Sequence, residues 1–147
     1  VGRYVGRSLR EGLRRYVEGS FVIKDPVELF VAQNVALVGL LYPLVYETII
    51  DDVLSSQGGT PVAMLTQFMT DWFTETRKWV DATVKIAAAE SPENKEVMAR
   101  WLSQWRDRSA AALLPVARIA LGDRSDEVVG EVVQQFNARM AKAGVAL

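Results

Sequence analysis

The chain has 147 residues, half of them hydrophobic, and a formal net charge of −1 at neutral pH. This balance gives no general attraction to nucleic acid or to acidic surfaces. Cysteine is absent, which excludes disulfides and thiolate metal sites and fits a reducing compartment. Histidine is absent too. A serine-type triad, a zinc site and the Glu-x-x-His iron ligands of di-iron bundles therefore each lack a required member, and the chain is poorly equipped for catalysis.

The first segment, residues 1–24, predicts a basic N-terminal helix. Arg3, Arg7, Arg10 and Arg14 recur at spacings of four, three and four, so they share one face of a helix. The simpler interpretation is a solvated face opposite apolar residues. The alternative is a contact with an acidic partner, a membrane surface or phosphate. On that basis Arg7 and Arg14 are candidate interface residues.

Residues 22–47 are the stretch around which the rest of the chain is arranged. They predict a helix that runs from Pro26 to about Leu54 and ends at a loop over residues 55–59, which contains Gly58. Asp25 is suited to cap its N-terminus, because the carboxylate can accept a hydrogen bond from an unpaired backbone N–H. Pro26 fits the first helical position, and Glu28 would complete a capping box. Residues 29–46 carry no charge. A helix that is apolar nearly all round is buried on most sides, so we expect this one to lie inside a bundle.

The uncharged run is long enough to raise the question of a membrane span. Gln33, Asn34 and Pro43 interrupt it and acidic residues flank it, so we favour a buried helix of a soluble, cytoplasmic protein. The arginine-rich N-terminus also lacks the apolar core of a secretory signal. Pro43 should kink the helix or loosen one turn, because it cannot donate to the carbonyl four residues back. Gln33 and Asn34 should find hydrogen-bond partners across helices or across subunits.

Three more helices follow, each after a residue that is suited to cap the next helix. These helices are expected over residues 60–89, 92–121 and 125–143, with Thr60, Ser91 and Ser125 as their caps. No long stretch alternates with the period of a strand. The chain therefore predicts an all-α bundle of four to five helices, three of them near 30 residues and so about 45 Å long. We expect residues 1–147 to form a single helical domain, with residues 25–147 as the long-helix bundle.

Glu47, Asp51 and Asp52 follow the uncharged run, and the first two lie four residues apart on one helix face. Such carboxylates are able to bind a metal or to move a proton. Without histidine, a di-iron centre would need carboxylate ligands alone, so a solvated helix end is the simpler interpretation. We therefore assign no catalytic, cofactor-binding or metal-binding residue. An independent small-molecule-binding or enzymatic bundle that uses these acids is kept as a less favoured alternative.

The aromatic residues are the remaining candidates for a site. Trp72, Phe73, Trp79, Trp101 and Trp105 occur at helical spacings. For each one singly an ordinary core position is the simpler interpretation, but tryptophan is also enriched in interface cores. Together with the amides of the uncharged run and the basic face, they give a predicted subunit interface. Its members are Arg7, Arg14, Gln33, Asn34, Tyr42, Tyr46, Trp72, Trp79, Trp101 and Trp105.

Two segments carry a resemblance to a known family. Residues 16–47, YVEGSFVIKDPVELFVAQNVALVGLLYPLVYE, and residues 63–91, AMLTQFMTDWFTETRKWVDATVKIAAAES, resemble the smaller, ferritin-like beta hydroxylase subunit of bacterial multicomponent phenol and toluene monooxygenases. The likeness is closest to the phenol hydroxylase branch. It runs from Leu13 to near the C-terminus, and residues 25–46 are its most specific part. The resemblance implies a ferritin-like fold. The family's subunit is longer, and this chain resembles its C-terminal half, as a fragment or as a short relative.

The resemblance also implies a division of labour. The family's beta subunit carries no iron and packs against a larger alpha subunit that holds the carboxylate-bridged di-iron centre, with a small gamma subunit attached. Electrons come from an NADH-dependent flavin and iron–sulfur reductase, and a small regulatory protein is needed. We therefore expect a structural, non-catalytic subunit of an aromatic monooxygenase complex. The alternative is a self-associating helical module without an enzymatic role, such as a homodimer formed through exposed apolar faces.

Overall fold

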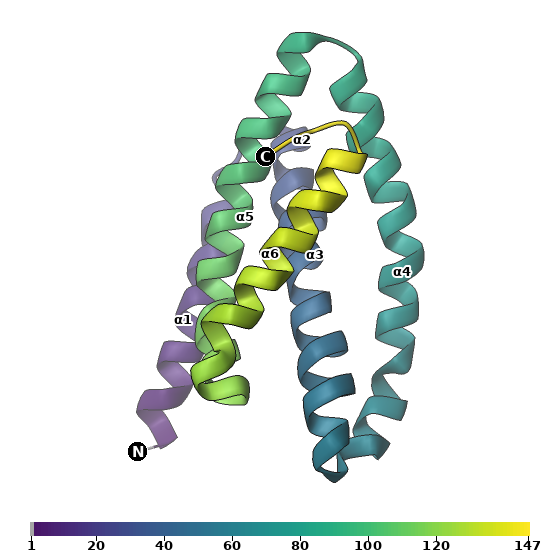
Figure 1. The fold of residues 1–147 in the computed structure, drawn as a ribbon. Coiled ribbons are helices and arrows are strands. Elements are labelled where there is room, and N and C mark those ends of the chain that lie inside the picture. The colour runs from purple at the N-terminus through teal and green to yellow at the C-terminus, as the bar shows by residue number, and fades with distance from the viewer. Residues whose placement is uncertain (1) are drawn as a thin grey trace.

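The computed structural model describes the backbone of residues 2–147 and the side chains of residues 11–147. Long helices dominate it (Figure 1), and the described residues contain no strand. The elements in chain order are α1 (Gly2–Ser20), α2 (Pro26–Phe30), η1 (Val31–Leu37), α3 (Val38–Tyr42), η2 (Pro43–Gly59), α4 (Thr60–Ala89), α5 (Pro92–Leu121), η3 (Gly122–Arg124) and α6 (Ser125–Lys142). The predicted all-α class with long helices is therefore confirmed.

The central helix consists of α2, η1, α3 and η2, which follow one another directly. Asp25 caps it as predicted: its carboxylate accepts hydrogen bonds from the backbone N–H groups of Val27 at 2.8 Å and Glu28 at 3.2 Å. The predicted capping box is wrong. The Glu28 carboxylate instead accepts a hydrogen bond at 3.0 Å from the indole N–H of Trp105 on α5. A buried indole needs an acceptor, and this contact ties the start of the central helix to α5.

Two stretches of the central helix, η1 and η2, have the wider turns of a π-helix. η2 begins at Pro43, which has no N–H to donate to the preceding turn. A wide turn is one of the known responses of a helix to an interrupted hydrogen-bond ladder. The looser helical turn that the sequence predicts at Pro43 is therefore confirmed. The helical path ends where Gly58 takes a φ of 90°, a conformation that favours glycine.

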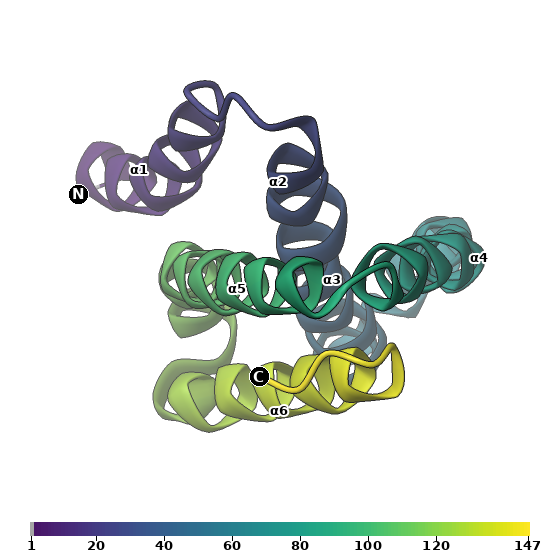
Figure 2. The same cartoon turned by 90° about the horizontal axis from the view of Figure 1, so that it is seen from above.

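The central helix lies among the other long helices, as the view from above shows (Figure 2). α5 packs along η1, and α4 returns along η2. α1 and α6 pack against α5 from opposite sides, whereas α4 lies at the edge of the bundle (Figure 2). The large, fully buried side chains come from the central helix, α4, α5 and α6. They include Val31, Val35, Leu40, Leu44, Val80, Val84, Leu102, Trp105, Leu113 and Met140.

The caps of the later helices are only partly as predicted. Ser91 caps α5, and its hydroxyl accepts a hydrogen bond from the Asn94 N–H at 3.1 Å. Thr60 does not cap α4, because Gly59 precedes the first helical residue and Thr60 is already inside the helix. Ser125 does not cap α6 either, since η3 leads into that helix and places Ser125 at its first, buried position. Both predictions were wrong by one residue, where a tight turn continued into the helix.

Gly39 allows α6 to cross close to α3. A Cβ at this position would lie 2.9 Å from Nη1 of Arg139 and 3.2 Å from a ring carbon of Phe136, both on α6. Real Cβ atoms rarely approach neighbours so closely, so a larger residue here would make the Arg139 guanidinium and the Phe136 ring shift. The close crossing also fixes where the Arg139 side chain lies.

Among the described residues, the span 26–89, which runs through the break at Gly58 into α4, includes a stretch long and apolar enough to cross a membrane. The core helix of a soluble protein passes the same test of length and composition. Here one side of that stretch packs against α5 and α6, and Val31, Val35, Leu40 and Leu44 are buried there. We therefore interpret the uncharged run as a core helix, in line with the prediction.

Candidate subunit interface

α4 carries apolar side chains on two of its sides. Phe73, Val80, Val84 and Ala88 lie on the first side and are buried against the neighbouring helices. The second side is turned from the first by about one residue step, roughly 100° around the helix, so it forms a flank of α4 beside the packed side. We name it the outer stripe; its members are Leu65, Phe68, Trp72, Trp79 and Ile86.

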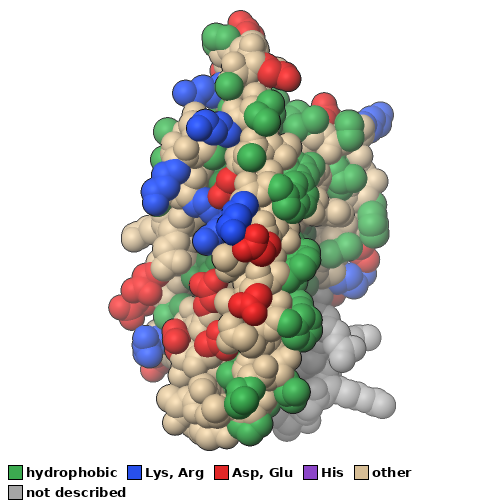
Figure 3. Space-filling model, turned by 90° about the vertical axis from the view of Figure 1, so that its right-hand side faces the viewer, with side chains coloured by type: hydrophobic (Ala, Val, Ile, Leu, Met, Phe, Trp, Pro, Cys, Tyr) green, Lys and Arg blue, Asp and Glu red, His purple; other side chains and the backbone are tan. Residues whose placement is uncertain are grey.

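The outer stripe is largely exposed. Its five side chains keep between 50% and 75% of their accessible surface. Figure 3 shows hydrophobic side chains in a column along this edge of the molecule, separate from the charged side chains beside it. Leu65, Trp72, Trp79 and Ile86 recur every seventh residue, which is the spacing of a seam that packs against another helix. A continuous exposed apolar strip of this kind makes α4 a candidate interaction surface.

Aromatic rings join α4 to the central helix beneath the stripe. The ring of Tyr42 stacks on Phe73 with centroids 5.3 Å apart, and lies 5.4 Å from Trp72 and 5.0 Å from Tyr46. Burial, with a smaller contribution from Tyr46, raises the pKa of Tyr42. Such offset and tilted pairs contribute about 0.5–1.5 kcal/mol each beyond the area they bury. Three of the predicted interface residues, Tyr42, Tyr46 and Trp72, are therefore brought together.

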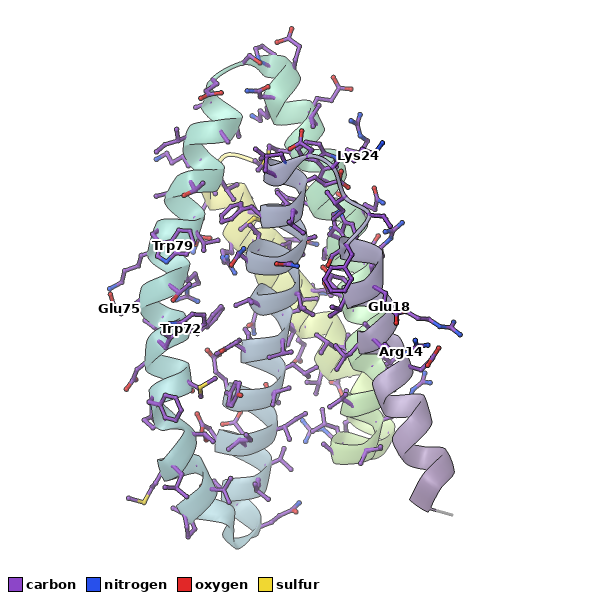
Figure 4. All side chains as sticks on the ribbon, turned by 180° about the vertical axis from the view of Figure 1, so that it is seen from behind. Arg14, Glu18, Lys24, Trp72, Glu75 and Trp79 are labelled. Carbon is purple, nitrogen blue, oxygen red and sulfur yellow. The ribbon has the colours of Figure 1, made fainter. Side chains whose placement is uncertain are left out.

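Trp79 extends this arrangement two turns further along α4. Its ring lies 5.9 Å from that of Phe30 on the central helix. Figure 4 labels both stripe tryptophans on α4, with Glu75 between them along the helix. Glu75 forms a surface ion pair with Lys78 at 2.7 Å. One edge of each tryptophan ring thus packs against the central helix, and the other edge of the ring is exposed to solvent.

Trp105 lies elsewhere, inside the core. Its side chain is 2% exposed and meets the ring of Tyr16 edge-on, with centroids 5.3 Å apart. The Tyr16 hydroxyl donates a hydrogen bond to the carbonyl of Ala32 at 2.6 Å. Burial raises the pKa of Tyr16 to about 12. Because the Trp105 side chain is buried within this chain, we do not include it in the proposed interface.

The other predicted interface residues are scattered. Gln33 donates a hydrogen bond across helices to the hydroxyl of Ser20 at 3.2 Å, and Asn34 and Trp101 are half-buried. Arg14 is exposed and pairs within α1, at 2.9 Å to Glu11 and 2.7 Å to Glu18. The side chain of Arg7 lies outside the described residues. Of these residues, the four whose side chains the structure describes lie outside the aromatic group on α4.

The acids at the end of the central helix form no ligand set. Glu47 and Asp51 are half-buried on η2 and Asp52 is exposed. Across the described part of the chain, no three Asp, Glu, His or Cys side chains lie close enough together to hold a metal ion. The wide turns of η2 also change the spacing of residues four apart. The absence of a metal site remains a prediction.

Sequence reasoning missed most of the outer stripe. Of its five members only Trp72 and Trp79 are among the predicted interface residues, and Leu65, Phe68 and Ile86 are not. A signal was available in the recurrence of Leu65, Trp72, Trp79 and Ile86 at every seventh position, in a row separate from the one that contains the buried Phe73 and Val80. Two apolar rows on one helix predict a second contact besides the one made within this chain.

The family match covers more than half of the chain. Residues 8–91 match the family described as methane/phenol/alkene hydroxylase. The chain belongs to this hydroxylase family. It is 47% identical over 135 residues to the phenol 2-monooxygenase oxygenase component DmpL of Pseudomonas sp. (strain CF600). It is 38% identical over 135 residues to the phenol 2-monooxygenase oxygenase component MhpL of Acinetobacter pittii (strain PHEA-2).

The chain is also similar in fold to a solved structure of the hydroxylase family. The chain matches a chain of phenol hydroxylase from Pseudomonas sp. OX1, studied under xenon pressure, with a TM-score of 0.86 and 33% identity. The match covers 95% of this chain and 41% of that one. Each of the two curated relatives is likewise covered over 40% of its length. The resemblance to the phenol hydroxylase branch is confirmed, and the fold is part of the larger ferritin-like one.

Proposed function

We propose that this chain is a structural, non-catalytic part of the oxygenase component of a multicomponent phenol hydroxylase, and that its outer stripe docks on another subunit. The observation that carries the proposal is found on α4, which lies inside the family match and exposes five large apolar side chains in a row. Burying such side chains contributes about 1.5–3 kcal/mol each, which favours a protein partner over solvent. The relatives named as oxygenase components support the type of assembly.

The occupant we propose for the stripe is the larger alpha subunit, which the resemblance expects to hold the di-iron centre. This chain would position that subunit and supply no ligand to its metal. A small gamma subunit and an NADH-dependent reductase would complete the system. We also propose that residues 1–147 act as one helical domain, with residues 1–24 as its basic first helix, and that the complex is cytoplasmic. The packing of Tyr16 on Trp105 supports the single domain, because it joins α1 to α5 in one core.

Co-purification tests the docking. The chain is co-expressed with a tagged alpha subunit of a phenol hydroxylase, either unchanged or with Leu65→Gln and Ile86→Gln combined. Both stripe positions are exposed, so the double variant should fold normally and lose most of the captured chain. The matched control is Ile119→Gln on α5, where an equally apolar side chain is 59% exposed away from α4. Equal capture of all three chains would contradict the docking, and no capture of the unchanged chain would contradict the assembly.

Self-association is the second candidate, because a seam with a spacing of seven is also able to pair two copies of α4. Light scattering on the isolated chain separates the two. A tight symmetric dimer that the Leu65→Gln and Ile86→Gln double variant dissociates would favour the self-associating module. Polydisperse aggregates that the double variant disperses would favour a subunit separated from its partner.

A further inference from the structure

A pocket of about 540 Å³ lies between α4 and α6, on the side of α4 away from the outer stripe. Its charged and polar lining consists of Arg77, Asp81, Lys85, Gln135, Arg139 and Lys142. Figure 3 shows Lys and Arg side chains, interspersed with Asp and Glu, beside the hydrophobic column. Four cationic groups and one carboxylate thus share one concave site, although the whole chain carries a net charge of −1.

The one carboxylate is already engaged. Asp81 accepts a hydrogen bond at 2.7 Å from Nε of Arg139, whose side chain is 13% exposed. No acid among the described residues forms an ion pair with Arg77, Lys85 or Lys142. Burial lowers the pKa of Arg139 and nearby Arg77 lowers it further, while Asp81 opposes both effects. Positive charge in the pocket therefore exceeds what the chain itself neutralises.

Both guanidinium groups are held in place by aromatic rings. Arg77 lies over the ring of Phe73 with its central carbon 5.6 Å from the centroid, and Arg139 lies 5.8 Å from the centroid of Phe136. The close crossing at Gly39 confines Arg139 further. A guanidinium that is already fixed loses little entropy when it forms the paired hydrogen bonds that oxyanions accept.

We propose that this pocket binds a small oxyanion with two negative charges, of which phosphate is the simplest member. Arg139 and Arg77 would donate to its oxygens, and Lys85 and Lys142 would neutralise the remaining charge. Lys142 lies in the last turn of α6, where the negative end of the helix dipole favours a cation. The proposal does not depend on the assembly proposed above, since every group involved belongs to this chain.

Calorimetric titration of the full 147-residue chain with inorganic phosphate tests the site. Ionic strength is kept constant with chloride, so that general screening is the same throughout. We expect saturable binding of one phosphate per chain. Glycerol phosphate and succinate, titrated in the same way, identify whether the ligand is free phosphate, a phosphate ester or a dicarboxylate.

Arg77→Gln and Lys142→Gln should each weaken phosphate binding about tenfold, the loss expected for one charge-assisted hydrogen bond. Both residues are exposed, so these variants should fold normally. The matched controls are Lys95→Gln and Arg100→Gln, which remove the same charge from exposed positions on α5 and should leave the affinity unchanged. Equal weakening in all four variants would overturn the proposal, as would the absence of saturable binding by all three ligands.

Discussion

Trp105 on α5 and the pair Trp72 and Trp79 on α4 are the same residue type, in helices of 30 residues each. Trp105 is almost fully buried and hydrogen-bonded, whereas the α4 pair remains half-exposed. The difference comes from what lies outside each helix. α1, α6 and the central helix surround α5, while α4 lies at the edge with the central helix on one side. Tryptophans on two helices of equal length therefore lie in different environments: Trp105 completes a core, and Trp72 and Trp79 keep one side exposed to solvent.

The largest expected effect on stability is at Trp105, the buried tryptophan. Trp105→Ala should lower the free energy of unfolding by about 4 kcal/mol, because it opens a large cavity and leaves Glu28 without its indole donor. Trp72→Ala, which removes a half-exposed ring, should cost about 1 kcal/mol. Urea denaturation measures both. Equal losses would mean that the two tryptophans do not differ as described.

The stability of the core around Trp105 should depend on pH, because Tyr16 packs against that ring. Burial raises the pKa of Tyr16 to about 12, whereas an unfolded tyrosine ionises near pH 10. The stability gained from keeping Tyr16 neutral is complete below pH 10 and is lost as the pH rises to 12, by about 2 kcal/mol in total. Denaturation midpoints between pH 9 and 12 measure the loss. A Tyr16→Phe chain should lack this part of the decline; an unchanged decline would place the titrating group elsewhere.

A smaller effect is expected at the start of the central helix, which holds Glu28 against Trp105. Asp25→Ala should cost about 1 kcal/mol, because it removes the acceptor of two first-turn N–H groups. Thr60→Ala at the start of α4 should cost less than about 0.5 kcal/mol, because no cap is lost there. Thermal denaturation of the two variants compares them directly, and the opposite order would show that the caps are wrongly assigned.

The smallest effect on stability should occur on the outer stripe itself. Phe68→Gln and Ile86→Gln each replace an exposed apolar side chain and should change the free energy of unfolding by less than about 0.5 kcal/mol. The same variants should reduce aggregation of the isolated chain. A loss above about 2 kcal/mol in either one would show that the stripe packs within this chain.

Much of the fold follows from local patterns in the sequence. Asp25 with Pro26 and Ser91 with Pro92 mark helix starts that the structure reproduces, and Gly58 marks the break before α4. The exceptions are residues whose role depends on a distant partner. Glu28 bonds to Trp105, 77 positions away, so no local pattern separates it from a capping-box residue. Ser125 follows a tight turn that is absorbed into α6.

The candidate sites were less predictable, because burial depends on which helices become neighbours. Trp79 and Trp105 both follow an apolar pattern, and only the packing of α1 and the central helix on α5 assigns them to different environments. The basic pocket combines side chains from α4 and α6, which are far apart in the chain. Neither helix alone has a cluster of basic residues that would indicate it. The family match supports the assembly in which these surfaces would be used.

Solvent exposure of α4 in the presence of the alpha subunit tests the central claim most directly. Hydroxyl-radical footprinting of Leu65, Trp72 and Trp79, compared between the isolated chain and the chain bound to the alpha subunit, measures it. The structure predicts strong labelling in the isolated chain and at least a fivefold decrease in the complex, with Ile119 unchanged as an internal reference. Labelling that stays the same in a complex shown to have formed would mean that the outer stripe is not where the subunits meet.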